Sequence, residues 1–159
     1  MKILITGSSK GIGFQLSKDL LNEGHKVVLH YNSDNLKIKK LILNHKTNCE
    51  MAQADLSKEN GAYDLFNKTN KLIGFPDIII NNAGIAESAP INQKTTDWAR
   101  SFDRTISVNL KSPSVISKLF IEKKRKDKIK KKLRIINIAS RAAFRGEVED
   151  FISYACSKG

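Results

Sequence analysis

Short apolar runs separated by helix-like segments place the strongest constraint on the fold of this chain. The runs "ILI", "VVL", "III" and "RIINI" are hydrophobic at successive positions rather than at every second one. Strands of this kind are covered on both faces, as they are in a parallel sheet. The sequence therefore predicts five strands, at Lys2–Thr6, Lys26–Tyr31, Cys49–Ala54, Asp77–Asn81 and Arg134–Ala139.

The segments between these runs carry helical patterns. In the first segment Ile12, Leu16 and Leu20 recur at i, i+4 and i+8, and Gly24 follows as a C-terminal stop. The expected helices are Gly11–Glu23, Asp34–His45, Ser57–Leu72 and about Trp98–Lys124. Alternating strands and helices predict an α/β protein with a Rossmann-like, doubly wound parallel sheet. In such sheets ligands bind beyond the carboxyl ends of the strands.

Length and composition narrow the class of protein. A chain of 159 residues is about one domain, so residues 1–159 are expected to form a single unit. No apolar run approaches the ~20 residues that span a bilayer, and the N-terminus reaches glycine before a signal peptide could form, which predicts a cytoplasmic protein without membrane contact. Neither the two cysteines nor the three histidines have the spacing of metal ligands, so no metal site is expected.

The net charge of +12 is concentrated in the segment Glu122–Arg134. A strongly basic chain can bind nucleic acid or another acidic partner. This segment contains no aromatic residue on which a base could stack, so specific nucleic-acid binding is not expected. A solvated helix end and loop is the favoured explanation of these lysines.

A glycine-rich turn, "TGSSKGIG" at Thr6–Gly13, follows the first strand and opens the first helix. Its glycines allow a tight turn and a close approach to a pyrophosphate, whose charge would be met by free N–H groups and the helix dipole. Such a turn could also be purely structural, but its place between strand and helix favours dinucleotide binding. The candidate cofactor-binding residues here are Gly7, Ser9, Lys10, Gly11, Ile12 and Gly13.

Two further polar segments follow the third and fourth strands. In "ADL", Asp55 could accept a hydrogen bond from an adenine amino group, and in "NNAG" the small Ala83 and Gly84 leave space for a ring or a ribose. Each of these segments alone could simply end a strand, because Asn and Asp favour turns. The candidate cofactor-binding residues here are Asp55, Leu56, Asn82, Ala83 and Gly84.

A possible acid–base pair lies near the C-terminus. Tyr154 and Lys158 are four residues apart, so on a helix they share one face, and Ser140 follows the fifth strand. An ammonium group beside a tyrosine favours the phenolate and so lets the phenol exchange protons near neutral pH. The pattern predicts that Tyr154 acts as an acid or a base.

Taken together, these motifs resemble the short-chain dehydrogenase/reductase family over the whole length of the chain. The resemblance rests on TGxxxGIG at Thr6–Gly13, NNAG at Asn81–Gly84, Asn109 in "SVNL", Ser140 in "IINIAS" and YxxxK at Tyr154–Lys158. These motifs occur in the order and at nearly the spacing of the family. The resemblance implies an oxidoreductase that transfers hydride between a nicotinamide cofactor and a carbonyl substrate.

The same resemblance implies a role for each of four catalytic candidates. Tyr154 would give a proton to the substrate carbonyl and Ser140 would hydrogen-bond the same oxygen. Lys158 would hold the nicotinamide ribose, so that Tyr154 and Lys158 both also contact the cofactor. Asn109 would position a water that links Lys158 to solvent.

The choice of cofactor is expected to favour NADP(H) over NAD(H). Family members that prefer NAD usually carry an acidic residue at the end of the second strand, where it binds the ribose hydroxyl. Here that position is occupied by Tyr31, Asn32 and Ser33, and Lys10 in the glycine turn could pair with a 2′-phosphate. Asn32 is therefore a further candidate. A shifted loop that brought Asp34 to the ribose would reverse this expectation.

The chain departs from the family in two respects. Ser140 and Tyr154 are fourteen positions apart, one more than is usual, and the chain stops at Gly159. The family continues through the rest of the tyrosine helix, two more strands and a substrate-covering loop, so the sheet is expected to be incomplete at its C-terminal end, with the fifth strand as an exposed edge. For a chain of this length we expect impaired cofactor binding and little turnover. The full-length protein is expected to form a homo-oligomer.

Within the family the chain most resembles 3-oxoacyl-[acyl-carrier-protein] reductases of fatty acid biosynthesis. "SRAAFRGE" and the basic stretch Glu122–Arg134 carry this resemblance. A cationic surface beside the mouth of the site could dock an acidic acyl carrier protein. The alternatives are a reductase of another small ketone, steroid or sugar, and an inactive nucleotide-binding protein.

Overall fold

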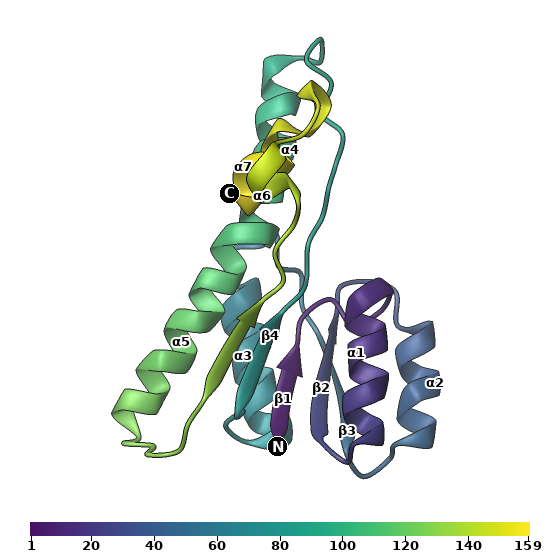
Figure 1. Ribbon diagram of the computed structural model, residues 1–159, viewed down its shortest axis with the longest axis vertical. Helices are drawn as coiled ribbons and strands as arrows, with labels where there is room; N and C mark the ends of the chain where they lie inside the picture. Colours follow the sequence, from purple (N-terminus) through teal and green to yellow (C-terminus); the bar gives the residue numbers. More distant parts are fainter.

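The computed structural model describes all 159 residues and contains one parallel sheet of five strands. The strands are ordered β3-β2-β1-β4-β5, which is the doubly wound arrangement expected from the sequence (Figure 1). Every neighbouring pair is parallel. The bounds are β1 Lys2–Ile5, β2 Lys26–Tyr31, β3 Cys49–Gln53, β4 Ile78–Asn81 and β5 Arg134–Asn137.

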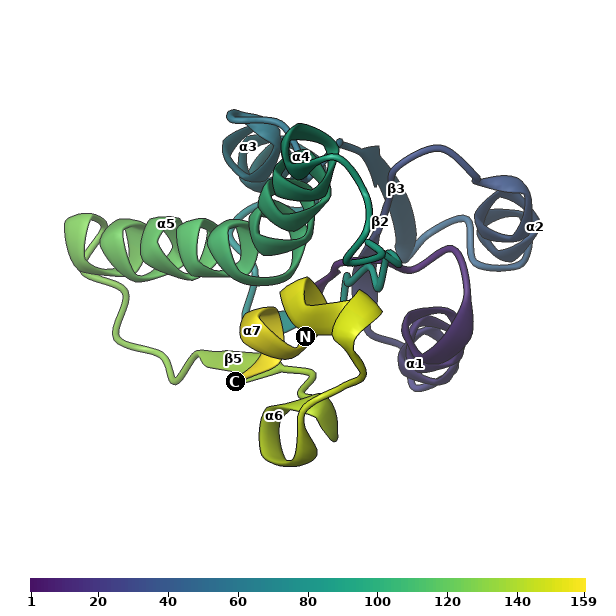
Figure 2. The ribbon, with the colours of Figure 1, turned by 90° about the horizontal axis from the view of Figure 1, so that it is seen from above.

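Helices connect the strands and cover the sheet. Figures 1 and 2 show α3 and α5 on one face and α1 and α2 on the other, while α4, α6 and α7 lie above the carboxyl ends of the strands. None of the helices is long and apolar enough to cross a membrane. The bounds are α1 Gly11–Asn22, α2 Leu36–Asn44, α3 Gly61–Ile73, α4 Thr95–Ile106, η1 Ser107–Lys111, α5 Ser112–Lys126, α6 Ala142–Arg145, η2 Glu149–Phe151 and α7 Ile152–Lys158.

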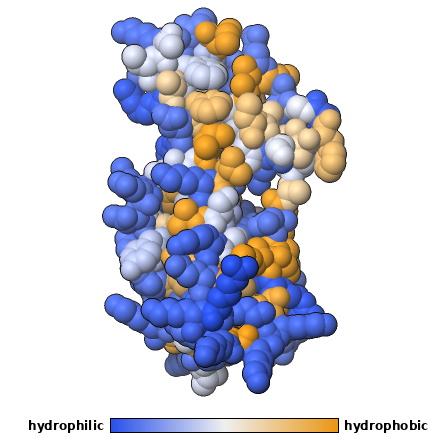
Figure 3. All heavy atoms as spheres, turned by 90° about the vertical axis from the view of Figure 1, so that its left-hand side faces the viewer, coloured by the Kyte–Doolittle hydropathy of each residue, from blue (hydrophilic) through white to orange (hydrophobic).

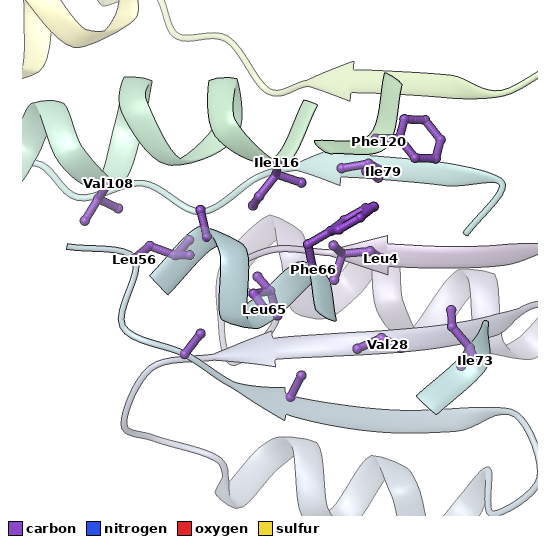
Figure 4. Packing of buried hydrophobic residues seen from close by; sticks show 13 residues of the cluster. Leu4, Val28, Leu56, Leu65, Phe66, Ile73, Ile79, Val108, Ile116 and Phe120 are labelled. Atoms are coloured by element: carbon purple, nitrogen blue, oxygen red, sulfur yellow. The ribbon is translucent and has the colours of Figure 1, made fainter. Parts of the chain in front are cut away.

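Two hydrophobic cores lie on the two faces of the sheet. Alternate residues of each strand point to opposite faces, so Leu4 joins one core and Ile3 the other. The first core packs Leu65 of α3 and Phe120 of α5 against the sheet (Figure 4). The second packs the strands against α1 and α2. Double coverage explains why β1, β2 and β4 are apolar at successive positions.

The helix expected at about Trp98–Lys124 is instead three segments in one continuous run. It begins three residues earlier, at Thr95, and a π-helical turn at Ser107–Lys111 separates α4 from α5. The two other long helices start later than expected for a local reason. The Asp34 carboxylate accepts a hydrogen bond from the Leu36 backbone N–H, and the Asp55 carboxylate accepts one from Ser57, so a turn precedes each helix.

The prediction that the fifth strand is covered on both faces is wrong. β5 pairs only with β4 and is one of the two edges of the sheet. The side chain of Ile135 packs on the first core, whereas Ile136 on the opposite face is 41% exposed. No helix covers that second face, because α1 and α2 both lie further along the sheet.

The basic segment also lies elsewhere than expected. Lys131 forms an ion pair with Asp77, which directly precedes β4, and Arg134 begins β5 opposite Ile78. The lysines therefore surround the amino ends of the strands, where α5 ends (Figure 1), and hydrophilic side chains dominate this lower part of the molecule in Figure 3. The segment Glu122–Arg134 therefore does not form the cationic surface that was expected beside the mouth of the site.

Candidate active site

The segment after β4 is joined to the glycine turn by a set of short hydrogen bonds. The Thr6 hydroxyl accepts hydrogen bonds from the backbone N–H groups of Asn82 (3.0 Å) and Ala83 (2.9 Å). In return the Asn82 side-chain amide donates to the carbonyl oxygens of Thr6 (2.9 Å) and Gly7 (3.0 Å). Two candidate segments that are about 75 residues apart in the sequence thus form one surface.

Two glycines of the turn are required by close packing. Gly7 has a φ of +68°, and a Cβ atom there would lie 2.8 Å from the Cα of Ala83. A Cβ atom at Gly13 would lie 2.3 Å from both the Gly7 carbonyl oxygen and the Asn82 amide nitrogen. Only glycine fits at these positions. Gly11 has a φ of +57° and faces open space, together with exposed Lys10 and Ile12 and half-buried Ser9.

His30 is a residue of this edge that the sequence reasoning considered only as a metal ligand. Its imidazole is 3% exposed and forms hydrogen bonds with the Gly7 backbone N–H (3.0 Å, at Nδ1) and with the Ala54 carbonyl oxygen (3.0 Å, at Nε2). Burial lowers the pKa of His30 to about 4, although the Ala54 hydrogen bond and the charge of Asp55 act in the opposite direction and Lys68 in the same one. The imidazole is therefore neutral near pH 7.

The lowered pKa of His30 predicts a loss of stability in mild acid. As the pH falls below the ordinary pKa of 6.5, His30 becomes protonated in the unfolded chain. In the folded chain it stays neutral until the pH reaches about 4. The contribution of the neutral His30 to the free energy of unfolding is fully present above pH 6.5. It declines by roughly 3 kcal/mol between pH 6.5 and pH 4. Chemical denaturation measured from pH 7 to pH 4 should show the decline, and His30→Asn should remove it.

The carboxylates are the same in wild type and in His30→Asn, so their contribution cancels in this comparison. Hydrogen bonds from Ser57 lower the pKa of Asp55 below the ordinary 3.8. Burial raises the pKa of Asp77, but its hydrogen bonds with Lys131 and Lys2 outweigh this effect, so the stability that both carboxylates contribute is lost as the pH falls through that value. A stability difference between wild type and His30→Asn that stays constant from pH 7 to pH 4 would contradict the prediction.

Asp55, which directly follows Ala54 at the end of β3, is held by Ser57. Its carboxylate accepts hydrogen bonds from the Ser57 hydroxyl (2.7 Å) and the Ser57 N–H (2.9 Å). These bonds, the hydroxyl first, lower the pKa of Asp55 against the opposing effect of burial, and the charges of Lys58 and Arg104 add to the shift. The group is thus a fixed carboxylate able to accept a further hydrogen bond. Leu56 beside it is buried and contributes to the first core.

The loop after β2 carries Asn32 at the expected ribose position and Asp34 two residues further on. Asn32 is exposed, and its backbone carbonyl accepts a hydrogen bond from the Gln53 side chain (3.0 Å). Asp34 bonds the N–H of Leu36 at the start of α2 (3.1 Å), so its carboxylate belongs to its own helix.

Asn109 lies in the π-helical turn, and its side chain forms hydrogen bonds with two neighbouring segments. Its Oδ1 accepts a hydrogen bond from the Ile85 N–H (2.8 Å), while its Nδ2 donates to the Ile85 carbonyl (2.8 Å) and to the Ser157 hydroxyl (2.9 Å). One side chain therefore ties the segment after β4 to α7. Because both amide hydrogens are used, only oxygen atoms of Asn109 remain for a water.

Lys158 lies between these elements. Its ammonium donates a hydrogen bond to the Ile138 carbonyl beyond β5 (3.1 Å). A Cβ atom built on Gly84 would be 3.7 Å from the Lys158 nitrogen and 3.5 Å from Asn109 Oδ1, so all three groups border one space. The structure thus brings Lys158, Asn109 and Gly84 together.

Ser140 and Tyr154 lie at the same edge without a direct contact. Ser140 follows Ile138 by two residues, and its hydroxyl oxygen accepts a hydrogen bond from the Ala142 N–H (3.2 Å). Tyr154 is half-buried on α7, one turn before Lys158, and its hydroxyl makes no hydrogen bond within the chain. Their meeting at a substrate oxygen stays a prediction. No group of three His, Cys, Asp or Glu side chains gathers anywhere in the chain.

Three residues that hold the candidate site residues in place were not predicted from the sequence. Ile85 and Ser157 hold Asn109, and His30 holds the glycine turn. The only signal for His30 was a polar residue within the apolar run "VVLHY". Ser157 stands inside the YxxxK motif, where nothing in its residue type indicates a partner 48 positions away.

A parallel sheet in this order with a glycine turn at its carboxyl edge defines a Rossmann-like nucleotide-binding protein. The sequence profile described as short chain dehydrogenase matches residues 1–159, and the chain belongs to this family.

Similar proteins agree in class but differ in activity. The chain is 35% identical to the uncharacterized oxidoreductase YjdA of Bacillus subtilis, over 98% of this chain and 62% of the relative. It is 34% identical to the 3-oxoacyl-[acyl-carrier-protein] reductase FabG of Rickettsia prowazekii, over 86% of this chain and 52% of the relative. The structure of 4-hydroxyisoleucine dehydrogenase complexed with NADH superimposes with a TM-score of 0.84 at 29% identity, covering 99% of this chain and 61% of that one. The chain thus spans between about half and three fifths of the length of these relatives.

Proposed function

We propose that this chain belongs to an oxidoreductase that reduces a carbonyl group to an alcohol by hydride transfer from NADPH. The observation that carries the proposal is the space beside Gly84, which Lys158 and Asn109 border from two other elements. This space adjoins the glycine turn through the hydrogen bonds of Asn82. Family membership and the relatives named above support the reaction class.

The residues present fit a dinucleotide. Close packing at Gly7 and Gly13 brings bare backbone to the N-terminus of α1, where N–H groups and the helix dipole favour a pyrophosphate. The Asp55 carboxylate suits an adenine amino group, and the absence of side chains at Gly84 leaves room for a ribose near Lys158. Ser9, Ile12, Leu56 and Ala83 would complete the walls of this site.

The cofactor would supply the hydride. Tyr154 donates a proton to the substrate oxygen, while Ser140 donates a hydrogen bond to the same atom and so stabilises the charge that develops on it. Lys158 holds the ribose and keeps positive charge near the phenol. Asn109 keeps α7 in place through Ser157, so that Lys158 faces Gly84.

A preference for NADPH over NADH is the finer part of the proposal. Asp34 lies three residues beyond Tyr31, and one oxygen of its carboxylate is bonded to the N–H of Leu36 at the start of α2, which favours a position away from the ribose. Lys10 is exposed in the turn and Asn32 is exposed after β2, so both could face a 2′-phosphate, and Lys10 would meet its charge.

Lys10→Glu should lower the affinity for NADPH about tenfold more than the affinity for NADH, because the reversed charge repels the pyrophosphate of both cofactors but the 2′-phosphate of NADPH alone. Fluorescence titration with each cofactor measures both dissociation constants. The matched control is Lys18→Glu, the same charge change at an exposed position two turns along α1. Equal losses for both cofactors in Lys10→Glu would remove Lys10 from recognition of the 2′-phosphate.

The substrate proposed first is a 3-oxoacyl thioester on an acyl carrier protein. The relative from Rickettsia prowazekii supports this assignment. The basic segment contributes nothing to it, because those lysines lie at the amino ends of the strands. A small ketone, steroid or sugar is the alternative.

The test is NADPH oxidation by the full-length protein, followed by absorbance, with an acetoacetyl thioester and with a panel of small ketones, steroids and keto sugars. Turnover with the thioester at a kcat/KM at least tenfold above every other compound supports the first substrate class. Turnover of another compound with comparable efficiency redirects the substrate and retains the reaction. No oxidation of NADPH or NADH with any carbonyl compound would contradict the proposed function.

A further inference from the structure

His30 connects three neighbouring strands at the edge where the cofactor is expected. It lies near the end of β2, and its imidazole reaches the turn after β1 on one side and the end of β3 on the other. Its Nδ1 pairs with the Gly7 N–H and its Nε2 with the Ala54 carbonyl oxygen, each at 3.0 Å. Its own backbone carbonyl accepts a third bond, from the Ser8 N–H (2.8 Å).

The two partners fix the protonation state of the ring. The Gly7 N–H is a donor, so Nδ1 must carry a lone pair, and the Ala54 carbonyl is an acceptor, so Nε2 must carry the hydrogen. Only the neutral tautomer with hydrogen on Nε2 satisfies both contacts. Burial holds the ring in its neutral state, since the pKa of His30 is lowered to about 4.

These bonds constrain the peptide groups that lead into both halves of the site. Gly7 has a left-handed φ of +68°, and its carbonyl is held by Asn82, so both polar groups of Gly7 are used within the protein. The Gly7 N–H therefore points inward and is not one of the amides open to an anion. On the other side, Ala54 directly precedes Asp55.

We propose that His30 is a positioning residue that holds the glycine turn and Asp55 at the separation that a single dinucleotide spans. This inference rests on the proposed binding of NADPH. A buried polar side chain weakens a fold unless it is hydrogen-bonded, and an apolar residue would fill the same place in β2. An apolar residue would leave the Gly7 N–H and the Ala54 carbonyl unpaired, so the turn and the end of β3 would move independently.

Three variants separate this role from simple packing. His30→Leu removes both side-chain bonds. His30→Asn places an amide oxygen near the position of Nδ1 and so keeps the bond to Gly7, and His30→Gln places an amide nitrogen near Nε2 and keeps the bond to Ala54. The dissociation constant for NADPH is measured by fluorescence titration on each variant, and circular dichroism gives the folded fraction used to correct it.

We expect His30→Leu to bind NADPH about tenfold more weakly than wild type and His30→Asn to bind within threefold of it. His30→Gln should be weaker than His30→Asn, because the turn loses its anchor. The proposal is overturned if His30→Leu stays within threefold of wild type, or if His30→Asn is no tighter than His30→Leu. If His30→Leu does not fold, the order of His30→Asn and His30→Gln decides in the same way.

A spectroscopic signature tests the contacts without any cofactor. The ¹⁵N chemical shifts of His30 at pH 7 should be those of the neutral ring with hydrogen on Nε2, and a charged ring or hydrogen on Nδ1 would overturn the proposal. If wild type binds neither NADPH nor NADH, the proposed function fails and this role fails with it. If wild type binds NADPH and His30→Leu binds equally well, only the role of His30 fails.

Discussion

Tyr154→Phe is expected to lower kcat for carbonyl reduction by about 10²–10⁴-fold, the usual contribution of a positioned acid or base. The change removes one oxygen atom that makes no hydrogen bond within the protein, so folding should be unaffected. Affinity for NADPH should change little, because Lys158 and the glycine turn remain. Stopped-flow measurement of NADPH oxidation, with cofactor binding titrated separately, gives the two quantities.

Tyr63→Phe is the matched control for this variant. Tyr63 is 52% exposed in the first turn of α3 and loses the same oxygen atom. Its kcat should stay within twofold of wild type. If Tyr154→Phe retained a tenth or more of the wild-type kcat, Tyr154 would not be the proton donor, and the reaction would need another acid at this edge.

Gly13→Ala is expected to abolish measurable NADPH binding, with a dissociation constant raised at least 100-fold. The new Cβ atom would lie 2.3 Å from the Gly7 carbonyl oxygen and the Asn82 amide, and neither can move without breaking the bonds that join β1 to β4. Overpacking of this kind costs about 1–3 kcal/mol, so the melting temperature should also fall by roughly 3–10 °C. Fluorescence titration and thermal unfolding measure the two effects.

Gly24→Ala separates lost stability from lost binding. Gly24 has a φ of +80°, which disfavours alanine, but no atom lies within 4 Å of the new Cβ and the residue is at the far end of α1. We expect a stability loss of about 1 kcal/mol and unchanged NADPH affinity. Wild-type affinity in Gly13→Ala would show that the turn does not hold the cofactor.

The five strands and their alternation with helices were predicted correctly from the sequence. Strands β1, β2 and β4 are covered on both faces, so their apolar runs reported their surroundings directly. The glycine turn was recognisable because backbone packing at Gly7 and Gly13 leaves no alternative residue. Both features leave their mark on the residue types of one short segment, and local patterns could therefore predict them.

Other features depend on partners that a linear pattern does not contain. "RIINI" in β5 has the same apolar pattern as a central strand, although no helix covers its second face. A histidine in "VVLHY" gives no sign that its two ring nitrogens meet the turns after β1 and β3. The π-helical turn was also not predictable, because the contact of Asn109 with Ile85 arises only in the folded chain.

The π-helical turn inserts one extra residue into the continuous helical run from α4 to α5. An α-helix advances about 100° per residue, so one extra residue in a turn rotates everything before it by that amount relative to everything after it. Asn109 can then face Ile85 while Ile116 and Phe120 still face the sheet. A deletion of one residue between Ser107 and Lys111 would make the run a regular α-helix. Either Ile116 and Phe120 would then leave the core, or Asn109 would lose its contacts with Ile85 and with Ser157 of α7.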